Sequence, residues 1–258
     1  MPKFAANLSM LFTEEAFLDR FATAAAAGFR GVEYLFPYDV EAAAIRKRLD
    51  DHGLTQVLFN LPAGDWGAGE RGIACQPGRV EEFRAGVDQA IEYARVLGNT
   101  QVNCLAGIKP QGVSDDEARQ TLMENLRFAA EKLEAAGILL IVEPINTRDI
   151  PGFFLNHTEQ ALAIFDEVGS NNLKLQYDIY HMQIMEGDLA PTIERHLERI
   201  AHVQVADNPG RHEPGTGEIH YPFLFAHLDR LGYTGWVGAE YKPEAGTQEG
   251  LGWLDAVR

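Results

Sequence analysis

ILLIVE, residues 138–143, is an apolar run that ends on a glutamate, Glu143, and follows a long helical pattern. Three later stretches are apolar runs with an acid or an amide at or near the end: LKLQYD at 173–178, HVQV at 202–205 and WVGAE at 236–240. Apolar runs of this length between helical stretches predict strands buried on both faces of a parallel sheet. Their polar residues would stand at one end of that sheet; these are Glu143, Asp178, Gln204 and Glu240.

The same alternation extends over the rest of the chain. Further strands are predicted at residues 4–8, 31–35, 54–59 and 101–105, and the first helix is expected to begin at Thr13 as its N-cap and to end before Gly28. Eight strands alternating with helices over 258 residues predict an α/β fold, a single (β/α)8 TIM barrel domain covering residues 1–258. An open doubly wound sheet is the alternative, and it also binds ligands at the carboxyl ends of its strands.

The amino-acid composition argues against some classes of binding partner. The net charge of −16 argues against nucleic acid, because phosphate backbones are held by clustered lysines and arginines. The only two cysteines, Cys75 and Cys104, are too few for a disulfide scaffold and are expected to be reduced thiols. No signal-peptide pattern opens the sequence, and no apolar run approaches the roughly 20 residues that cross a bilayer. We therefore expect a cytoplasmic protein without a membrane partner, and we leave open whether it forms a homo-oligomer.

The four polar strand ends predict a metal site. A buried carboxylate is costly unless a positive group meets it, and a cup of oxygen atoms suits a hard divalent cation. We expect Mg²⁺ ahead of Mn²⁺ or Co²⁺, held by Glu143, Asp178, Gln204 and Glu240. The alternative interpretations are simpler. A single acid at a strand end can cap the following turn, and the Gln204 amide can satisfy a hydrogen bond in the core.

Other candidate residues lie in loops beyond the predicted strands. His181 follows Asp178 by three residues, and Arg211 is the best-placed fixed cation for an anionic substrate. The Gly/Pro-rich stretch 60–78 is too long for a simple connection, so its Trp66 and Arg71 suggest a lid as readily as a surface loop. Within it, residues 67–72 match G-x-G-x-x-G, but they do not open a helix, and we reject a nucleotide-binding interpretation.

These segments resemble the hydroxypyruvate isomerase group of the xylose isomerase-like sugar isomerase and epimerase barrels. The matching stretches cover nearly the whole chain and include FAANLSMLF, GFRGVEYLFPYD, NLPAGDWGAGERGIACQPGR, VEPIN, QYDIYHMQIMEG, HVQVADNPGRHEPGTGEI and GWVGAEYKP. The resemblance implies an enzyme that interconverts hydroxypyruvate, a small anionic 2-oxo acid, and 2-hydroxy-3-oxopropanoate.

The resemblance also implies roles for particular residues. Glu143 and Glu240 would be the acid–base pair, and both would bind the divalent metal together with Asp178 and Gln204. His181 and Arg211 match residues that hold substrate oxygens in related ketose epimerases. Those epimerases often have a histidine where this chain has Gln204, so the ligand set departs from theirs at this position.

Four other functions stay open on the sequence. Isomerisation of 2-oxo-tetronates and 3-epimerisation of a neutral ketose would use the same barrel and metal. A DNA-repair endonuclease is disfavoured by the charge and by the all-oxygen ligand set. A non-catalytic binding barrel would bind a ligand without proton exchange.

Overall fold

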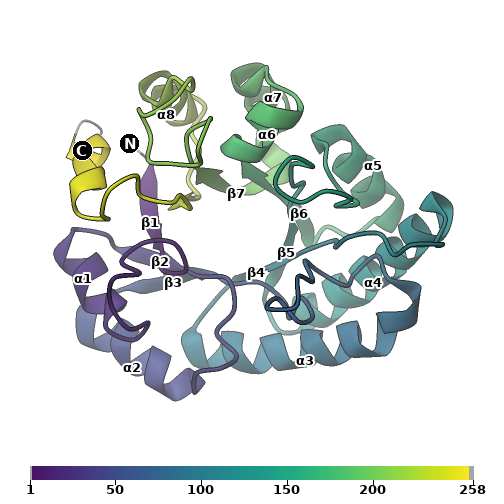
Figure 1. Cartoon of the computed structure of the whole chain (residues 1–258). Coiled ribbons are helices and arrows are strands. Elements are labelled where there is room, and N and C mark those ends of the chain that lie inside the picture. Colours follow the sequence, from purple (N-terminus) through teal and green to yellow (C-terminus); the bar gives the residue numbers. More distant parts are fainter. Residues whose placement is uncertain (1, 256–258) are drawn as a thin grey trace. The chain divides into compact units, whose positions relative to one another are not determined.

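The computed structural model describes residues 2–255, and the chain divides into two compact units. The first unit combines Met1–Val57 with Tyr177–Arg258, and the second is Leu58–Gln176. Strands β3 (Thr55–Leu58) and β6 (Leu173–Asp178) each run across a boundary between the two ranges. Figure 1 labels the elements along the chain.

In the first unit, four parallel strands are hydrogen-bonded in the order β2-β1-β8-β7. They are β1 (Lys3–Asn7), β2 (Gly31–Glu33), β7 (Ile200–Val205) and β8 (Trp236–Ala239). Asn7 is opposite Glu33, and Gln204 is opposite Gly238. Because all four strands run in the same direction, this register gathers their carboxyl ends at one edge.

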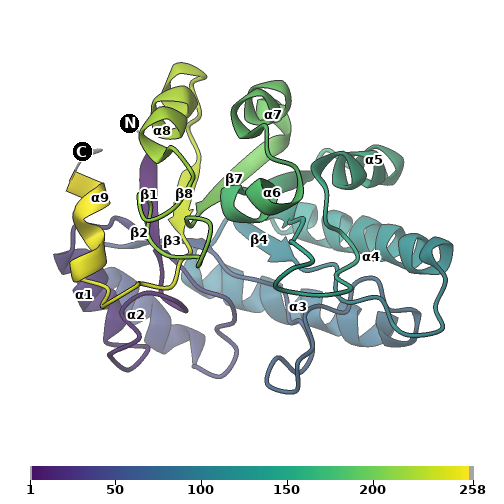
Figure 2. The ribbon, with the colours of Figure 1, turned by 45° about the horizontal axis from the view of Figure 1, so that its top comes forward.

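Helices connect and follow these strands. They are α1 (Arg20–Ala26), α2 (Ala42–His52), α6 (Ile179–Met185), α7 (Leu189–His196), α8 (Tyr221–Arg230) and α9 (Gly252–Asp255), with short 3-10 turns at Leu197–Arg199 and Glu249–Leu251. The last helix lies beside the first strand, where the ring centroids of Phe4 and Trp253 are 5.1 Å apart (Figure 2). Aromatic packing thus ties the C-terminal end of the described chain to β1.

The second unit contains β4 (Gln101–Cys104), β5 (Leu139–Val142) and most of β6, paired in parallel in that order. Its helices are α3 (Val80–Leu97), preceded by a 3-10 turn at Pro77–Arg79, α4 (Asp115–Ala135) and α5 (Thr158–Val168). Ser114 caps α4 by accepting a hydrogen bond from the Glu117 backbone N–H. Among residues 2–255, no helix is long and apolar enough to cross a membrane.

Two local predictions differ from the structure. Thr13 is wrong as the first N-cap, because α1 begins only at Arg20 after a series of turns. Helix α6 was not predicted; it begins directly after β6, where the Asp178 carboxylate caps its first turn. A seven-residue helix carries too few apolar repeats to stand out in a sequence pattern.

Candidate functional site

A network of buried side chains in the first unit centres on Glu240, the residue that follows β8. Its Oε2 accepts hydrogen bonds from Asn7 Nδ2 at 2.9 Å and from Gln204 Nε2 at 2.6 Å. Its Oε1 accepts one from Arg211 Nη2 at 2.7 Å. Glu240 is only 7% exposed, so its charge depends on these donors rather than on water.

A second carboxylate, Glu33 at the end of β2, lies against the same donors. Its Oε1 accepts hydrogen bonds from Asn7 Nδ2 at 3.1 Å and from Gln204 Nε2 at 2.7 Å. Its Oε2 lies 2.8 Å from His202 Nε2, which must carry the hydrogen if the carboxylate accepts. Gly238 makes room for this carboxylate, because a Cβ there would lie 2.3 Å from Glu33 Oε1.

Asp178 is the last residue of β6, and only one of its two carboxylate oxygens accepts hydrogen bonds in the described part of the chain. Oδ1 accepts the backbone N–H groups of Tyr180, at 2.8 Å, and His181, at 3.4 Å. Oδ2 is buried and accepts no hydrogen bond within the described part of the chain; His181 Nε2 lies 3.6 Å away and Arg211 Nη2 3.8 Å away. A buried carboxylate oxygen of this kind fits a site for a cation.

Arg211 lies in a loop after β7 that is held by several hydrogen bonds. The buried Asp207 carboxylate accepts the backbone N–H groups of Asn208, Gly215 and Ile219 at 2.8–3.1 Å. Arg211 donates its own N–H to the Asp207 carbonyl at 3.0 Å and adopts a left-handed backbone with φ of 59°. A non-glycine residue held in that region indicates that the loop, not intrinsic preference, places the guanidinium.

Burial shifts the protonation of these groups. It raises the pKa of Glu240 to about 8, with Arg211 acting in the opposite direction and Asp178 and Glu33 adding to the rise. It also raises the pKa of Asp178 and, together with Arg211, holds the pKa of His181 well below its usual range. His181 is therefore a neutral imidazole, able to accept or donate a hydrogen bond.

Glu143 belongs to the second unit, where it follows β5. Its Oε2 accepts a hydrogen bond at 3.2 Å from Asn103 Nδ2, which also donates to Asn60 Oδ1 at 3.1 Å. Glu143 is 5% exposed and Asn103 is fully buried. Glu143, Asp178 and His181 are each buried and each offers an atom of a type that binds metal ions.

The loop that contains Trp66 and Arg71 is tied together internally. The Arg71 guanidinium lies 4.2 Å from the centre of the Trp66 ring, and Arg71 Nη1 donates to the Trp66 carbonyl at 3.0 Å. Glu70 accepts the backbone N–H of Asp65 at 2.5 Å, and its ion pair with Arg79 joins the loop to the turn before α3. This segment is thus a compact Ω-like loop rather than an extended connection.

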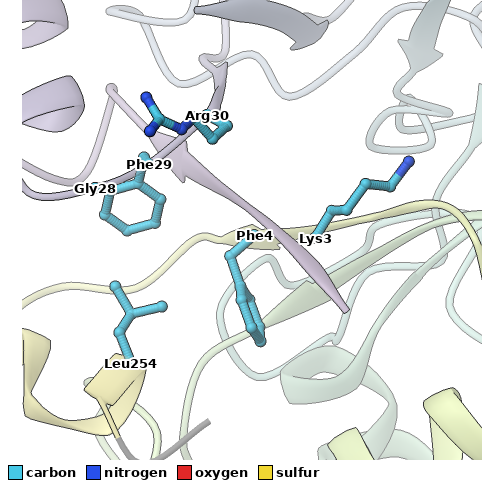
Figure 3. Close-up of a pocket in the computed structure, with 6 residues that line it drawn as sticks. All are labelled: Lys3, Phe4, Gly28, Phe29, Arg30 and Leu254. Atoms are coloured by element: carbon cyan, nitrogen blue, oxygen red, sulfur yellow. The ribbon is translucent and has the colours of Figure 1, made fainter. Parts of the chain in front are cut away.

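A small cavity of about 130 Å³ lies at the opposite, amino ends of β1 and β2. Figure 3 shows Phe4, Phe29 and Leu254 lining it, while Lys3 extends away from them. The Lys3 ammonium instead lies 5.1 Å from the Trp236 ring centre. The lining is largely apolar, and the described residues that form it include no carboxylate or amide side chain.

The structure brings together five of the predicted site residues in the first unit, namely Asp178, His181, Gln204, Arg211 and Glu240. Sequence reasoning missed Asn7, Glu33 and His202, which support this group, and Asn103, which bonds Glu143 in the second unit. Glu33 carried the same signal as the others, an acid at the end of an apolar strand. The strand predicted at 31–35 put Glu33 in its middle, whereas β2 ends at Glu33.

Comparison with known proteins extends these observations. The family profile described as "Xylose isomerase-like TIM barrel" matches residues 21–257. The chain is 57% identical over 258 residues, covering all of both chains, to the hydroxypyruvate isomerase of Escherichia coli K12. It is 55% identical over 254 residues, 98% of each chain, to the 2-oxo-tetronate isomerase of Cupriavidus necator.

A solved structure from Brucella melitensis, described as an AP endonuclease of family 2, is also similar. It shares 49% identity and a TM-score of 0.97, and each chain is covered completely. The family profile confirms the predicted fold class, an α/β barrel.

Proposed function

The chain belongs to the family of xylose isomerase-like TIM barrels, and we propose that it interconverts hydroxypyruvate and 2-hydroxy-3-oxopropanoate. The observation that carries this proposal is the 57% identity over the whole length to an enzyme named hydroxypyruvate isomerase. The chain is an isomerase, and the reaction moves one proton between adjacent carbons of a small 2-oxo acid. We infer that residues 1–258 form one catalytic domain. We also infer that the protein works in the cytoplasm, where its two buried free thiols would stay reduced.

The residues present fit a divalent metal ion. Asp178 Oδ2 is buried without a hydrogen-bond donor among residues 2–255, and the neighbouring candidates are oxygen ligands that suit Mg²⁺, Mn²⁺ or Co²⁺. We assign the ion to Glu143, Asp178, Gln204 and Glu240. When bound, it would stabilise the negative charge that develops on the substrate oxygens as the proton leaves.

Glu143 and Glu240 are proposed as the acid–base pair. One carboxylate removes a proton from C3 of hydroxypyruvate, and the other delivers a proton to C2. The hydroxyl proton passes from the oxygen on C3 to the oxygen on C2, so that the carbonyl and the hydroxyl exchange places. Burial that raises the pKa of Glu240 to about 8 supports this role, because proton transfer is most effective near the working pH. In a barrel, active-site groups stand at the carboxyl ends of the strands, which is the position of both glutamates.

Arg211 and His181 are proposed to hold the substrate. The guanidinium of Arg211 can pair with the substrate carboxylate in bidentate geometry, and the neutral His181 imidazole can bond a substrate oxygen. Arg211 already contacts Glu240 at 2.7 Å and thereby lowers its pKa. If the substrate carboxylate takes a share of that guanidinium, Glu240 becomes a stronger base when substrate is bound.

We further propose that the loop of Trp66 and Arg71 is a lid that excludes water from the reacting carbons. Its internal ties support movement as one piece, because the contact of Arg71 with Trp66 lies within the loop itself. Glycines with positive φ stand on either side, at Gly64 and Gly72.

The test is turnover of hydroxypyruvate by the purified chain, with and without a chelator, and by the variants Glu143→Gln and Glu240→Gln. Each variant should lose roughly 10²- to 10⁴-fold in rate while circular dichroism shows the fold retained. Near-normal turnover in either variant would remove that glutamate from the acid–base pair. Absence of turnover in the metal-loaded native chain would reject the isomerase assignment.

A second candidate reaction is isomerisation of 2-oxo-tetronates, which the 55% identity to the Cupriavidus enzyme favours. Measuring kcat/KM for both substrates on one preparation distinguishes the two. The same preparation should be offered DNA containing abasic sites, given the description of the Brucella structure. With a net charge of −16 we expect neither binding nor cleavage of DNA.

A further inference from the structure

We propose that Glu33 is a positioning residue that turns the Gln204 side chain so that it offers oxygen, not nitrogen, to the metal. This inference rests on the proposed metal site, but Glu33 itself is not a ligand in that site. It acts through the hydrogen bonds it accepts. Held in this way, an amide side chain can stand where the metal needs an oxygen ligand.

The contacts of Gln204 determine which terminal atom of its amide is nitrogen and which is oxygen. One terminal atom of Gln204 lies 2.7 Å from Glu33 Oε1 and 2.6 Å from Glu240 Oε2. Two carboxylate oxygens accept hydrogen bonds and repel another oxygen, so that atom must be the NH₂ group. By amide geometry, the carbonyl oxygen then points away from both carboxylates, and it is the atom of the amide that would bind a cation.

Asn7, at the end of β1, makes the same bridge. Its Nδ2 donates to Glu33 Oε1 at 3.1 Å and to Glu240 Oε2 at 2.9 Å. Two amide groups therefore join the same pair of carboxylate oxygens, one on Glu33 and one on Glu240. Each amide uses both of its N–H bonds, which leaves neither free to rotate without losing two charge-assisted hydrogen bonds.

Glu33 is itself held rigidly. It is 1% exposed, and His202, which is fully buried, holds its second oxygen at 2.8 Å. The carboxylate also fills the space that a side chain at position 238 would need. A buried acid with three donors and a reserved space is well placed to orient its neighbours, as outer-shell partners of metal ligands do.

Without the Glu33 carboxylate, the Gln204 amide would lose one of the two carboxylates that orient it. In Glu33→Gln, the new amide can donate to Gln204, so the flipped orientation becomes competitive. We expect Glu33→Gln to weaken Mn²⁺ binding roughly 10- to 100-fold, the range usual for an outer-shell partner. The readout is calorimetric titration of the metal-free chain with Mn²⁺, which does not depend on turnover.

A double-mutant cycle separates orientation from simple charge. Gln204→Ala removes the ligand, so adding Glu33→Gln to it should cause little further loss if Glu33 acts through Gln204. An equal loss in the Gln204→Ala background would overturn the proposal, because Glu33 would then act only through its own charge. Unchanged Mn²⁺ affinity in the single Glu33→Gln variant would overturn it as well, while leaving the isomerase proposal intact.

Two control variants distinguish a loss of Mn²⁺ binding from a loss of folding. Asn125→Ala removes another buried side-chain hydrogen bond, from Asn125 Nδ2 to the Ala74 carbonyl, and should lower stability without changing Mn²⁺ affinity. If Glu33→Gln fails to fold, Glu33→Asp keeps the charge but shortens the reach to Gln204, and it should also weaken Mn²⁺ binding. No Mn²⁺ binding by the native chain would overturn both this inference and the proposed metal site.

Discussion

At the scale of single residues, the first unit gathers like charges that would repel one another without their donors. Glu33 and Glu240 share the amide groups of Asn7 and Gln204, and Arg211 meets the outer oxygen of Glu240. Removing one partner of such a buried network costs more than the bond itself, because the remaining group stays buried and unsatisfied. The residues of this network are therefore expected to be sensitive even to conservative substitution.

Arg211→Lys tests the need for a planar fork of donors. Lysine keeps the charge but cannot form two parallel hydrogen bonds to a carboxylate, so KM for hydroxypyruvate should rise by about tenfold or more. The rate at saturation should change less, since the acid–base pair is intact. Steady-state kinetics separate the two parameters, and an unchanged KM would exclude Arg211 as the carboxylate partner.

Gly238→Ala tests how closely the Glu33 carboxylate approaches β8 at Gly238, the residue opposite Gln204. The new Cβ would lie 2.3–2.6 Å from the Glu33 carboxylate, so the chain should lose about 1–3 kcal/mol in its free energy of unfolding. The matched control is Gly78→Ala, where a Cβ meets nothing within 4 Å and φ is not positive. Urea unfolding that finds equal stability for both variants would contradict this description of the site.

At the scale of elements, the sequence pattern predicted strands and long helices well. The runs at 138–143, 173–178 and 236–240 correspond to β5, β6 and β8, and the cap of α4 at Ser114 is present. Local signals suffice there, because an apolar run or a capping residue acts within a few positions. They fail at the start of α1, since residues 13–19 form turns instead of helix and only the alanine-rich stretch after Arg20 is helical.

Asp207→Asn tests the loop between β7 and α8 as a support for Arg211. The amide nitrogen would face at least one backbone N–H that the carboxylate now accepts, at Asn208, Gly215 or Ile219. We expect a looser loop and a raised KM for hydroxypyruvate. Because the effect passes through Arg211, adding Asp207→Asn to Arg211→Lys should raise KM little further; fully additive losses in the double variant would contradict this route.

At the scale of the whole molecule, burial of Glu240 makes the free energy of unfolding depend on pH and on metal binding. The pKa of Glu240 rises from an ordinary 4.5 to about 8, so between those values the folded chain holds more protons than the unfolded chain. The free energy of unfolding of the metal-free chain should therefore fall as pH rises through that window. A bound divalent cation favours the carboxylate form and should reduce the fall.

Urea unfolding of the chelated chain at about pH 5 and about pH 8, repeated with Mg²⁺, measures this linkage. The Glu240→Gln variant is the control, because it cannot ionise at position 240 and should lose less stability over the same range. If the native chain and the variant lose equal free energy of unfolding over this range, ionisation of Glu240 is not the source of the pH dependence.

The sequence alone determined the fold class and most of the candidate residues, because both depend on patterns that repeat within one strand and one helix. Only the tertiary structure decided how those residues are held. Asn7 meets Glu240 from 233 positions away, and Gln204 meets Glu33 from 171. Such pairs depend on the register of parallel strands, which no local stretch of sequence encodes. The orientation of the Gln204 amide depends on that register too, because it follows from where two distant carboxylates come to lie.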